Sequence, residues 1–404
     1  MAHGIPPLRG GHQLQLLEGS REYFPALVEA IDAARTQVLL ETYIFDVTGA
    51  GADVGYALER AARRGVSVQL TVDGVGTPSQ EPWRWRLEQA GVQLRVYSPV
   101  GRFGLLERGQ WRRLHRKLCV VDARVGFCGG VNILDDFHDP NHGTLQAPRM
   151  DFALRVTGPL VAQMHQTMTR AWLRMQMFSR LRRAQLSGAL VSLRASRTHE
   201  PAAPQPRDET RSARAALVLR DNVRNRASIE RAYRRAIGHA REEIVIANAY
   251  FVPGGKMRRA IVQAARRGVK VKLLLQGRYE YFMQYYAARP VFGALLKAGV
   301  EIHEYSPSFL HAKVAVIDGT WATVGSSNLD PLSLLLAREA NVMVEDAGFA
   351  GRLRERLAYA MQHEGTQMDP VAYANRSRWQ RAKEWLAFAL MRLALAFQGK
   401  KGYL

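Results

Sequence analysis

The sequence predicts an α/β protein made of two tandem copies of one α/β sandwich domain, each a mixed sheet flanked by helices, related by pseudo-two-fold symmetry. Two observations lead to this prediction. Short sequences recur at an offset of about 206 residues, and within each copy helical periodicity alternates with short β-branched runs. Helices between strands imply right-handed crossovers, which place parallel strands beneath helices.

The repeat is clearest at the end of a helical segment. Residues 61–66, AARRGV, recur letter for letter at 264–269. Before this segment in the first copy, residues 38–44 form an apolar run typical of a buried strand, and residues 54–64 show amphipathic periodicity. Residues 66–72 form the next β-branched run. Each copy is therefore expected to alternate strands and helices.

The chain is expected to divide into four parts. The first domain spans residues 1–194 and the second spans residues 215–370. Residues 195–214 contain three prolines among charged and small residues, which is typical of a solvated linker. Residues 371–404 form a basic amphipathic tail.

The tail has an apolar core at residues 385–397, flanked by Lys and Arg. As a helix this core is about 20 Å long, which is less than the ~30 Å hydrocarbon thickness of a bilayer. We expect it to lie in the interface of an anionic membrane rather than to span it. The alternative is a terminal helix packed on the second domain.

Composition indicates a folded protein with a polyanionic partner. Among the 404 residues, 57 Lys and Arg against 36 Asp and Glu give a formal charge of +21. Hydrophobic residues at 47% exclude a disordered chain, and two cysteines exclude a disulfide framework and suit a reducing compartment. Neither a secretory signal nor a spanning helix is expected. Charge alone leaves nucleic acid and anionic lipid equally open.

Two copies of one motif, H-x-K-x4-D-x6-G-[G/S]-x-N, occupy matching places in the repeat. Histidine and lysine are two residues apart in the β-like runs at residues 114–121 and 310–317, so both side chains should point to one face. Each aspartate of this catalytic motif lies an odd number of residues after the lysine, so its side chain should point away from the face that histidine and lysine share. We therefore expect it to brace the structure. The asparagines and Ser326 supply donors for a phosphate. The members are His115, Lys117, Asp122 and Asn132, and then His311, Lys313, Asp318, Ser326 and Asn328.

One imidazole cannot be a neutral nucleophile and a protonated acid at the same time. Two copies facing each other supply both states, together with two ammonium groups for the oxygens of a phosphodiester. One histidine would attack phosphorus and form a phosphohistidine intermediate. The other would protonate the leaving alcohol and then deprotonate the acceptor. This chemistry requires neither a metal nor a cofactor.

These duplicated motifs resemble the phospholipase D superfamily over residues 16–345, and the sequences around them resemble the bacterial cardiolipin synthases of the short, ClsB-like type. The resemblance implies two tandem phospholipase D-like domains. It also implies transfer of a phosphatidyl group from one phosphatidylglycerol to another, with release of glycerol, through a phosphatidyl-histidine intermediate. The expected partners are phosphatidylglycerol, cardiolipin and the membrane surface. The expected location is peripheral, on the cytoplasmic side of the bacterial inner membrane.

The resemblance adds two carboxylates and an order of events. Glu339 lies where the superfamily places a carboxylate that holds a motif imidazole, and Asp151 occupies a comparable place after His115. For each, the alternative is a surface salt bridge. Superfamily precedent favours His115 as the nucleophile and His311 as the acid and base. Gly130 stands where the motif usually has Ser, so the first half lacks a hydroxyl donor.

Two other functions remain open. A hydrolase with the same chemistry would use water as the acceptor and act on a phospholipid or on nucleic acid. A non-catalytic binding protein is disfavoured because both His/Lys pairs are intact. The polar cluster at residues 135–142 lacks the tight ligand spacing of a metal site, so a polar loop is expected there. Oligomeric state is left open.

Overall fold

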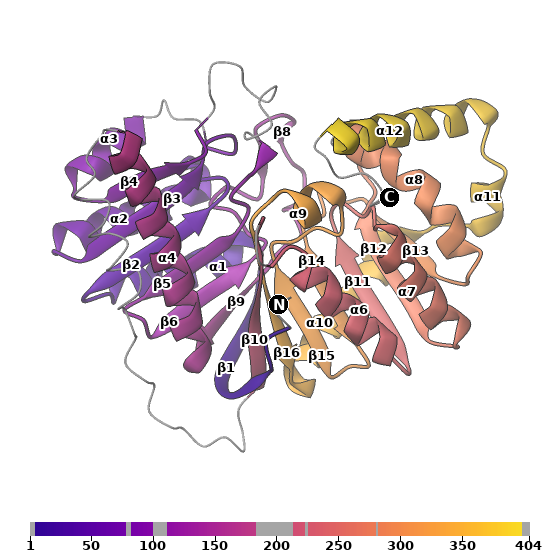
Figure 1. Ribbon diagram of the computed structural model, residues 1–404, viewed down its shortest axis with the longest axis horizontal. Coiled ribbons are helices and arrows are strands. Elements are labelled where there is room, and N and C mark those ends of the chain that lie inside the picture. Colours follow the sequence, from indigo (N-terminus) through magenta and orange to yellow (C-terminus); the bar gives the residue numbers. More distant parts are fainter. Residues whose placement is uncertain are drawn as a thin grey trace.

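The strands of both copies join into one sheet of 15 strands in the computed structural model (Figure 1). Most of the expected linker, residues 195–212, lies outside the residues that the structure describes. The strand that follows begins at Ala213, so the last two residues of the expected linker belong to the second copy. The structure describes residues 5–77, 82–99, 111–182, 213–222, 225–279 and 282–397.

The two halves repeat one strand order. The first half contributes, in spatial order, β1 (Arg9–Glu18), β9 (Phe152–Thr157), β6 (Val125–Gly129), β5 (Lys117–Val121), β2 (Gln37–Thr42), β3 (Ser67–Asp73) and β4 (Gln93–Tyr97). The second contributes β10 (Ala213–Arg220), β16 (Glu339–Glu345), β15 (Trp321–Gly325), β14 (Lys313–Ile317), β11 (Glu243–Asn248), β12 (Lys270–Gln276), β13 (Glu301–Tyr305) and the additional β17 (Gly365–Gln367).

Parallel and antiparallel pairs occur in both halves, as the repeat predicts. β2, β3 and β4 are parallel, as are β11, β12 and β13, and the remaining pairs are antiparallel. The halves meet where β1 pairs with β10, through Arg9 with Ala215 and His12 with Ala213. The predicted mixed α/β fold is confirmed, with the two sheets continuous across this seam.

Helices cover the sheet on both faces. The first half carries α1 (Gly19–Asp32), α2 (Ala52–Arg63), α3 (Pro82–Gln89) and α4 (Pro159–Arg182). The second carries α6 (Ser228–His239), α7 (Gly255–Arg266), α8 (Phe282–Leu296), α9 (Pro331–Leu335), α10 (Ala347–Tyr359), α11 (Pro370–Ala374) and α12 (Arg378–Phe397). A short hairpin, β7 (His138–Asp139) and β8 (Gly143–Thr144), lies apart from the sheet.

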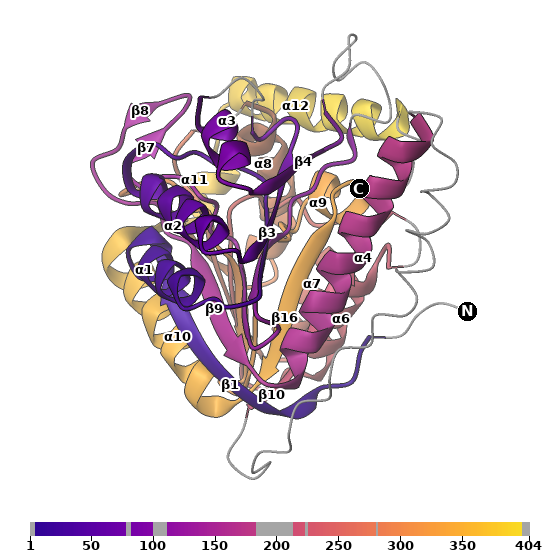
Figure 2. The same cartoon turned by 90° about the vertical axis from the view of Figure 1, so that its left-hand side faces the viewer.

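Three hydrophobic cores hold these layers together. One lies between the first sheet and α1 and α2, and a second lies between the second sheet and α6, α7 and α8. The third combines strands of both halves with α4 and α10. In Figure 2, α10 and α4 lie on opposite sides of the region where the halves meet. The halves therefore share buried apolar surface and hold each other in place.

The amphipathic pattern explains where α2 forms and where it ends. Val54, Ala57, Leu58 and Ala61 are fully buried, at the i, i+3, i+4 and i+7 spacing of one helix face. The chain then turns at Gly65, whose φ of +87° is open to glycine at no steric cost. β2, α2 and β3 lie within two residues of their predicted bounds.

The tail forms α11 and α12, and α12 packs along α8. Its buried face consists of the apolar residues Ala387, Phe388, Met391 and Leu395, together with Glu384, which pairs with Arg376. The tail helix therefore packs on the second domain. This packing is compatible with the expected contact with a membrane, because the opposite face of the helix is exposed. No helix among the described residues has the length and hydropathy needed to cross a membrane.

Candidate active site

Both motif histidines lie just before a strand rather than within one. β5 begins at Lys117 and β14 begins at Lys313, so the predicted strands over residues 114–121 and 310–317 are shorter than expected. Instead of continuing these strands, the histidine segments pair with the opposite half. Leu114 forms a bridge with Arg338, and Leu310 forms one with Met150.

Backbone hydrogen bonds fix these crossings. The backbone N–H of His115 donates to the carbonyl of Arg338 at 3.0 Å, and that of His311 donates to the carbonyl of Met150 at 2.8 Å. The residue after each acceptor is one of the two expected carboxylates. Each imidazole is therefore held beside a carboxylate from the other half of the chain.

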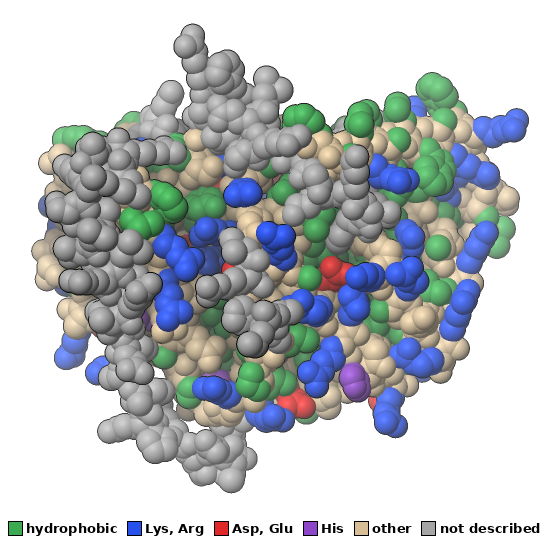
Figure 3. Space-filling model, viewed as in Figure 1, with side chains coloured by type: hydrophobic (Ala, Val, Ile, Leu, Met, Phe, Trp, Pro, Cys, Tyr) green, Lys and Arg blue, Asp and Glu red, His purple; other side chains and the backbone are tan. Residues whose placement is uncertain are grey.

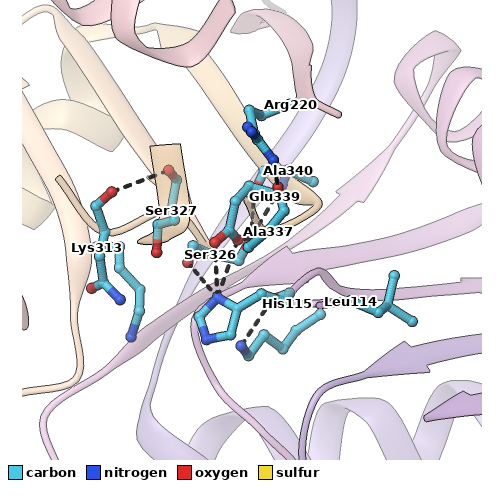
Figure 4. A network of polar contacts seen from close by, with 12 residues as sticks. Leu114, His115, Arg220, Lys313, Ser326, Ser327, Ala337, Glu339 and Ala340 are labelled. Carbon is cyan, nitrogen blue, oxygen red and sulfur yellow. Dashed lines mark hydrogen bonds and ion pairs between the residues drawn. The ribbon is translucent and has the colours of Figure 1, made fainter. Parts of the chain in front are cut away.

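Each motif histidine contacts the carboxylate of the other half, and we call this the exchanged pairing. The Nδ1 atom of His115 lies 3.1 Å from the Glu339 carboxylate, and that of His311 lies 2.5 Å from Oδ2 of Asp151. Figure 4 shows Nδ1 of the His115 ring directed at Glu339 and at the carbonyl of Ser326. With Nδ1–H donating, the lone pair is on Nε2, where it is available to a substrate.

Ser326 departs from the phosphate-binding role expected for it. It is completely buried, and its hydroxyl donates to Oε2 of Glu339 at 2.5 Å while accepting from the N–H of Ala340 at 3.1 Å. The hydroxyl therefore supports the carboxylate behind His115 and does not face a bound phosphate. At the matching Gly130, a Cβ would collide with the Asp151 carboxylate, which explains why the first half has glycine.

Both motif lysines are buried close to the imidazoles. Lys117 donates from Nζ to the carbonyl of His115 at 2.9 Å, and Lys313 donates likewise to the carbonyl of His311. Burial, together with the neighbouring Lys313 charge, lowers the pKa of Lys117 to about 7. Two cations so close together and so poorly solvated are costly unless an anion binds between them.

Burial also sets the charge of the imidazoles. It lowers the pKa of His115, against the opposing charge of Glu339, and lowers that of His311 well below the ordinary value, with Lys313 acting in the same direction. Burial raises the pKa of Asp151 to about 6, against the charge of Lys313. Without a bound anion, both rings are therefore neutral near pH 7.

The rings open into one cavity of about 560 Å³ lined by residues of both halves. His115, His311, Asn132 and Asn328 line it together. The side chain of Asn132 accepts from the N–H of Ile44 at 3.2 Å, which leaves its amide NH₂ to donate. Much of the remaining wall is apolar: Ile44, Val75, Trp111, Val131, Leu134, Pro140 and Ala337.

The motif aspartates lie outside this cavity. Asp122 accepts hydrogen bonds from the backbone of residues 35–37, and Asp318 does the same for residues 241–243. These segments lead into β2 and β11, so the carboxylates anchor the loops that enter the central strands. This geometry corresponds to the bracing role expected for both aspartates and not to a catalytic one, because neither residue is among those that line the cavity.

The sequence prediction missed four large cavity residues. Tyr43 comes directly after β2 and Tyr250 comes two residues after β11, and the Tyr43 ring packs edge-on to His115 at 5.1 Å. The repeat gives no signal for either tyrosine, because Tyr43 matches Ala249 and Tyr250 matches Ile44. Arg113 and Arg149 also line the cavity, each paired with an aspartate, and have no counterpart in the second half.

Four residues of the polar cluster at residues 135–142 line the cavity: Asp136, Asp139, Pro140 and Asn141. Arg149 donates to Oδ2 of Asp139 at 2.6 Å, and Asp136 accepts from the N–H of Ser20 at 2.5 Å. In the part of the chain that the structure describes, no three His, Cys, Asp or Glu side chains are grouped so that they could hold a metal ion. These carboxylates are occupied in tying the loop to the first half.

Residues 27–147 and 233–361 match a family described as cardiolipin synthase, PLD-like domain. The chain belongs to this phospholipase D-like family. It is 37% identical over 387 residues to cardiolipin synthase B of Escherichia coli (strain K12), which covers 95% of this chain and 89% of that relative. It is 38% identical over 388 residues to the Salmonella typhi protein of the same name, with the same two coverages.

A solved structure supports the phospholipase D-like fold. The crystal structure of phosphatidylserine synthase from Haemophilus influenzae Rd KW20 superposes with a TM-score of 0.68 at 13% identity, covering 98% of this chain and 97% of that one. The two matched phospholipase D-like segments fall one on each half and include all six His, Lys and Asp motif residues. Glu339 lies inside the second segment and Asp151 lies just beyond the first.

Proposed function

We propose that this enzyme is a cardiolipin synthase, which transfers a phosphatidyl group from one phosphatidylglycerol to another and releases glycerol. The observation that carries this proposal is the pair of imidazoles in one cavity, each held by its own carboxylate. The relatives named cardiolipin synthase B support the substrate. The apolar cavity wall supports a lipid as well, because it can accommodate the glycerol backbone of a phosphatidyl group.

In the first step, Nε2 of His115 attacks phosphorus as the bond from phosphorus to the glycerol oxygen breaks. His311 gives its proton to that oxygen, and glycerol leaves. The phosphodiester charge raises the pKa of the His311 imidazole in the complex, so this ring can carry the proton there. The Lys117 and Lys313 ammonium groups and the motif asparagines balance the charge that develops on the phosphate oxygens.

In the second step, His311 removes a proton from a hydroxyl of the second phosphatidylglycerol. The oxygen attacks phosphorus, the bond from phosphorus to His115 breaks, and cardiolipin forms. His311 ends protonated and His115 ends neutral, as in the complex with the first substrate. Glu339 and Asp151 hold each ring in the required tautomer and stabilise its positive charge. Water in place of the second lipid would give phosphatidic acid.

An incubation with phosphatidylglycerol vesicles tests this function. The purified chain is expected to produce cardiolipin and glycerol in equal amounts, because each transfer releases one glycerol. Phosphatidic acid as the main product would assign a hydrolase. Cleavage of DNA or RNA at a comparable rate, with no lipid product, would assign a nuclease. Absence of any turnover would leave only lipid binding and contradict the proposal.

The exposed face of α12 supports a peripheral position on the membrane. Trp379, Leu386, Leu390, Leu393 and Phe397 are each 43% to 70% exposed. At 100° per residue they fall within about 60° of one another, so they form one apolar stripe. Figure 1 shows α12 at the same end of the molecule as β8, with α9, whose Ser333 lines the cavity, just below them. The net charge of +21 favours the anionic cytoplasmic leaflet of the inner membrane.

Replacing Leu386, Leu390 and Leu393 together with serine is expected to weaken binding to phosphatidylglycerol vesicles at least about tenfold, because three apolar side chains leave the interface. Co-sedimentation with the vesicles measures this. Tyr56→Ser, which changes an exposed residue of α2, is the control and should bind normally. Turnover of a short-chain, soluble phosphatidylglycerol should be unchanged in both variants. Equal vesicle binding by all three proteins would contradict the assigned role of α12.

A further inference from the structure

A second large cavity lies on the surface between α6 and α7, with a volume of about 630 Å³. We call it the α6–α7 groove. It shares no lining residue with the catalytic cavity, and no Asp or Glu is among the described residues that line it. Figure 3 shows Lys and Arg side chains gathered over this part of the surface. Its six cationic lining residues are Arg231, Arg234, Arg235, Lys256, Arg259 and Arg267.

The other half of the molecule provides an internal comparison. α1 and α2 occupy the matching place, and there Arg60 and Arg64 lie 2.7 Å and 3.8 Å from the carboxylate of Asp32. The position that matches Asp32 is Gly238, and Gln263 stands where the first half has Arg60. Arg267 donates to backbone carbonyls, as the matching Arg64 does in the first half. The groove therefore lacks the carboxylate that pairs with Arg60 and Arg64 in the first half.

Gln263 in place of Arg60 removes one cation, but five other replacements increase the positive charge of the groove. Two acidic and three uncharged positions in the first half become basic in the second. Against these cations, the nearby Glu230 lies 3.9 Å from Arg234. The replacements are Glu29 by Arg235, Asp53 by Lys256, Val28 by Arg234, Tyr56 by Arg259 and Pro25 by Arg231. Packing of two helices does not require this charge, because α1 and α2 pack in the same way without it.

We infer that the α6–α7 groove is a second anion site, which binds a ligand carrying two or more phosphate groups. Five of its six cations are arginines, whose planar guanidinium groups bind phosphate through paired hydrogen bonds. Lys256, Arg259 and Arg267 are spread over the length of α7, so a single phosphate could contact only some of the six cations. Two sources have this chemistry: the headgroups of anionic phospholipids and a soluble polyphosphorylated molecule.

Titration calorimetry with inorganic tripolyphosphate at low salt tests the inference on the full chain. A groove variant combines Arg234→Ala, Arg235→Ala and Arg259→Ala. The matched control combines Arg60→Ala, Arg63→Ala and Arg64→Ala, which removes the same charge from the α1–α2 surface. The groove variant is expected to bind at least about tenfold more weakly than the wild type, and the control should stay within about twofold. Retained turnover shows that both variants are folded.

The result does not depend on the proposed activity, because binding is measured without turnover. Equal affinity of the groove and control variants, or no binding by the wild type, would overturn the inference. Flotation with phosphatidylglycerol vesicles then distinguishes the two sources. A loss of vesicle binding confined to the groove variant identifies lipid headgroups as the ligand. Unchanged vesicle binding, with weakened tripolyphosphate binding, identifies a soluble ligand.

Discussion

Alanine in place of either His115 or His311 is expected to lower the turnover of phosphatidylglycerol about 10⁴-fold, since one variant lacks the nucleophile and the other lacks the proton carrier. The measurement is the initial rate of glycerol release from vesicles. His239→Ala, which changes an exposed histidine at the end of α6, is the control and should retain full activity. Near-normal turnover in either active-site variant would exclude the two-imidazole scheme.

A substrate with a good leaving group separates the roles of the two histidines. Phosphatidyl-p-nitrophenol needs no proton on its leaving oxygen, so His311→Ala should still release one equivalent of nitrophenol in a rapid burst. That burst leaves a phosphatidyl group on His115, which mass spectrometry detects. His115→Ala should show no burst. The opposite pattern would make His311 the nucleophile.

The second large effect is expected from the carboxylates. Glu339→Gln and Asp151→Asn keep the side-chain volume but remove the charge that orients and stabilises each imidazolium, so each should reduce turnover between about 10² and 10⁴-fold. Glu339 contacts His115 and Asp151 contacts His311. With phosphatidyl-p-nitrophenol, Asp151→Asn should therefore keep the burst and Glu339→Gln should lose it.

The same experiment tests the exchanged pairing directly. If each carboxylate served the histidine of its own half, the burst would survive in Glu339→Gln and disappear in Asp151→Asn. Asp122→Asn is the matched control, because this carboxylate binds backbone N–H groups outside the cavity. It should lower the thermal midpoint of unfolding and change the rate per folded molecule little.

The fold could be predicted from the sequence because the repeat and the local periodicity carry the same information. The buried spacing of Val54, Ala57 and Leu58 predicts α2, and the AARRGV repeat predicts the second copy of that helix. Motif spacing likewise predicts two His/Lys pairs. These features depend on contacts that are close in sequence, which a linear pattern can record.

The arrangement between the halves could not be predicted in this way. The spacing of Glu339 from His311 says nothing about which imidazole it contacts, since that depends on the bridge between Leu114 and Arg338. The hydrogen-bond partner of Ser326 could not be predicted for a similar reason. The sequence alone does not indicate whether the Ser326 hydroxyl bonds a phosphate or Glu339. The fold buries Ser326 and places its hydroxyl against the Glu339 carboxylate.

The exchanged carboxylates make the chain a fused pair rather than two independent units. Either half alone would contain one motif histidine without the carboxylate that contacts it. A single copy could complete the chemistry only by dimerising with a second copy that supplies this carboxylate. Because both copies belong to one chain, their sequences do not have to be identical. Gly130 opposite Ser326, and the unequal charge of the α1–α2 and α6–α7 surfaces, are differences that a symmetric assembly of identical chains could not hold.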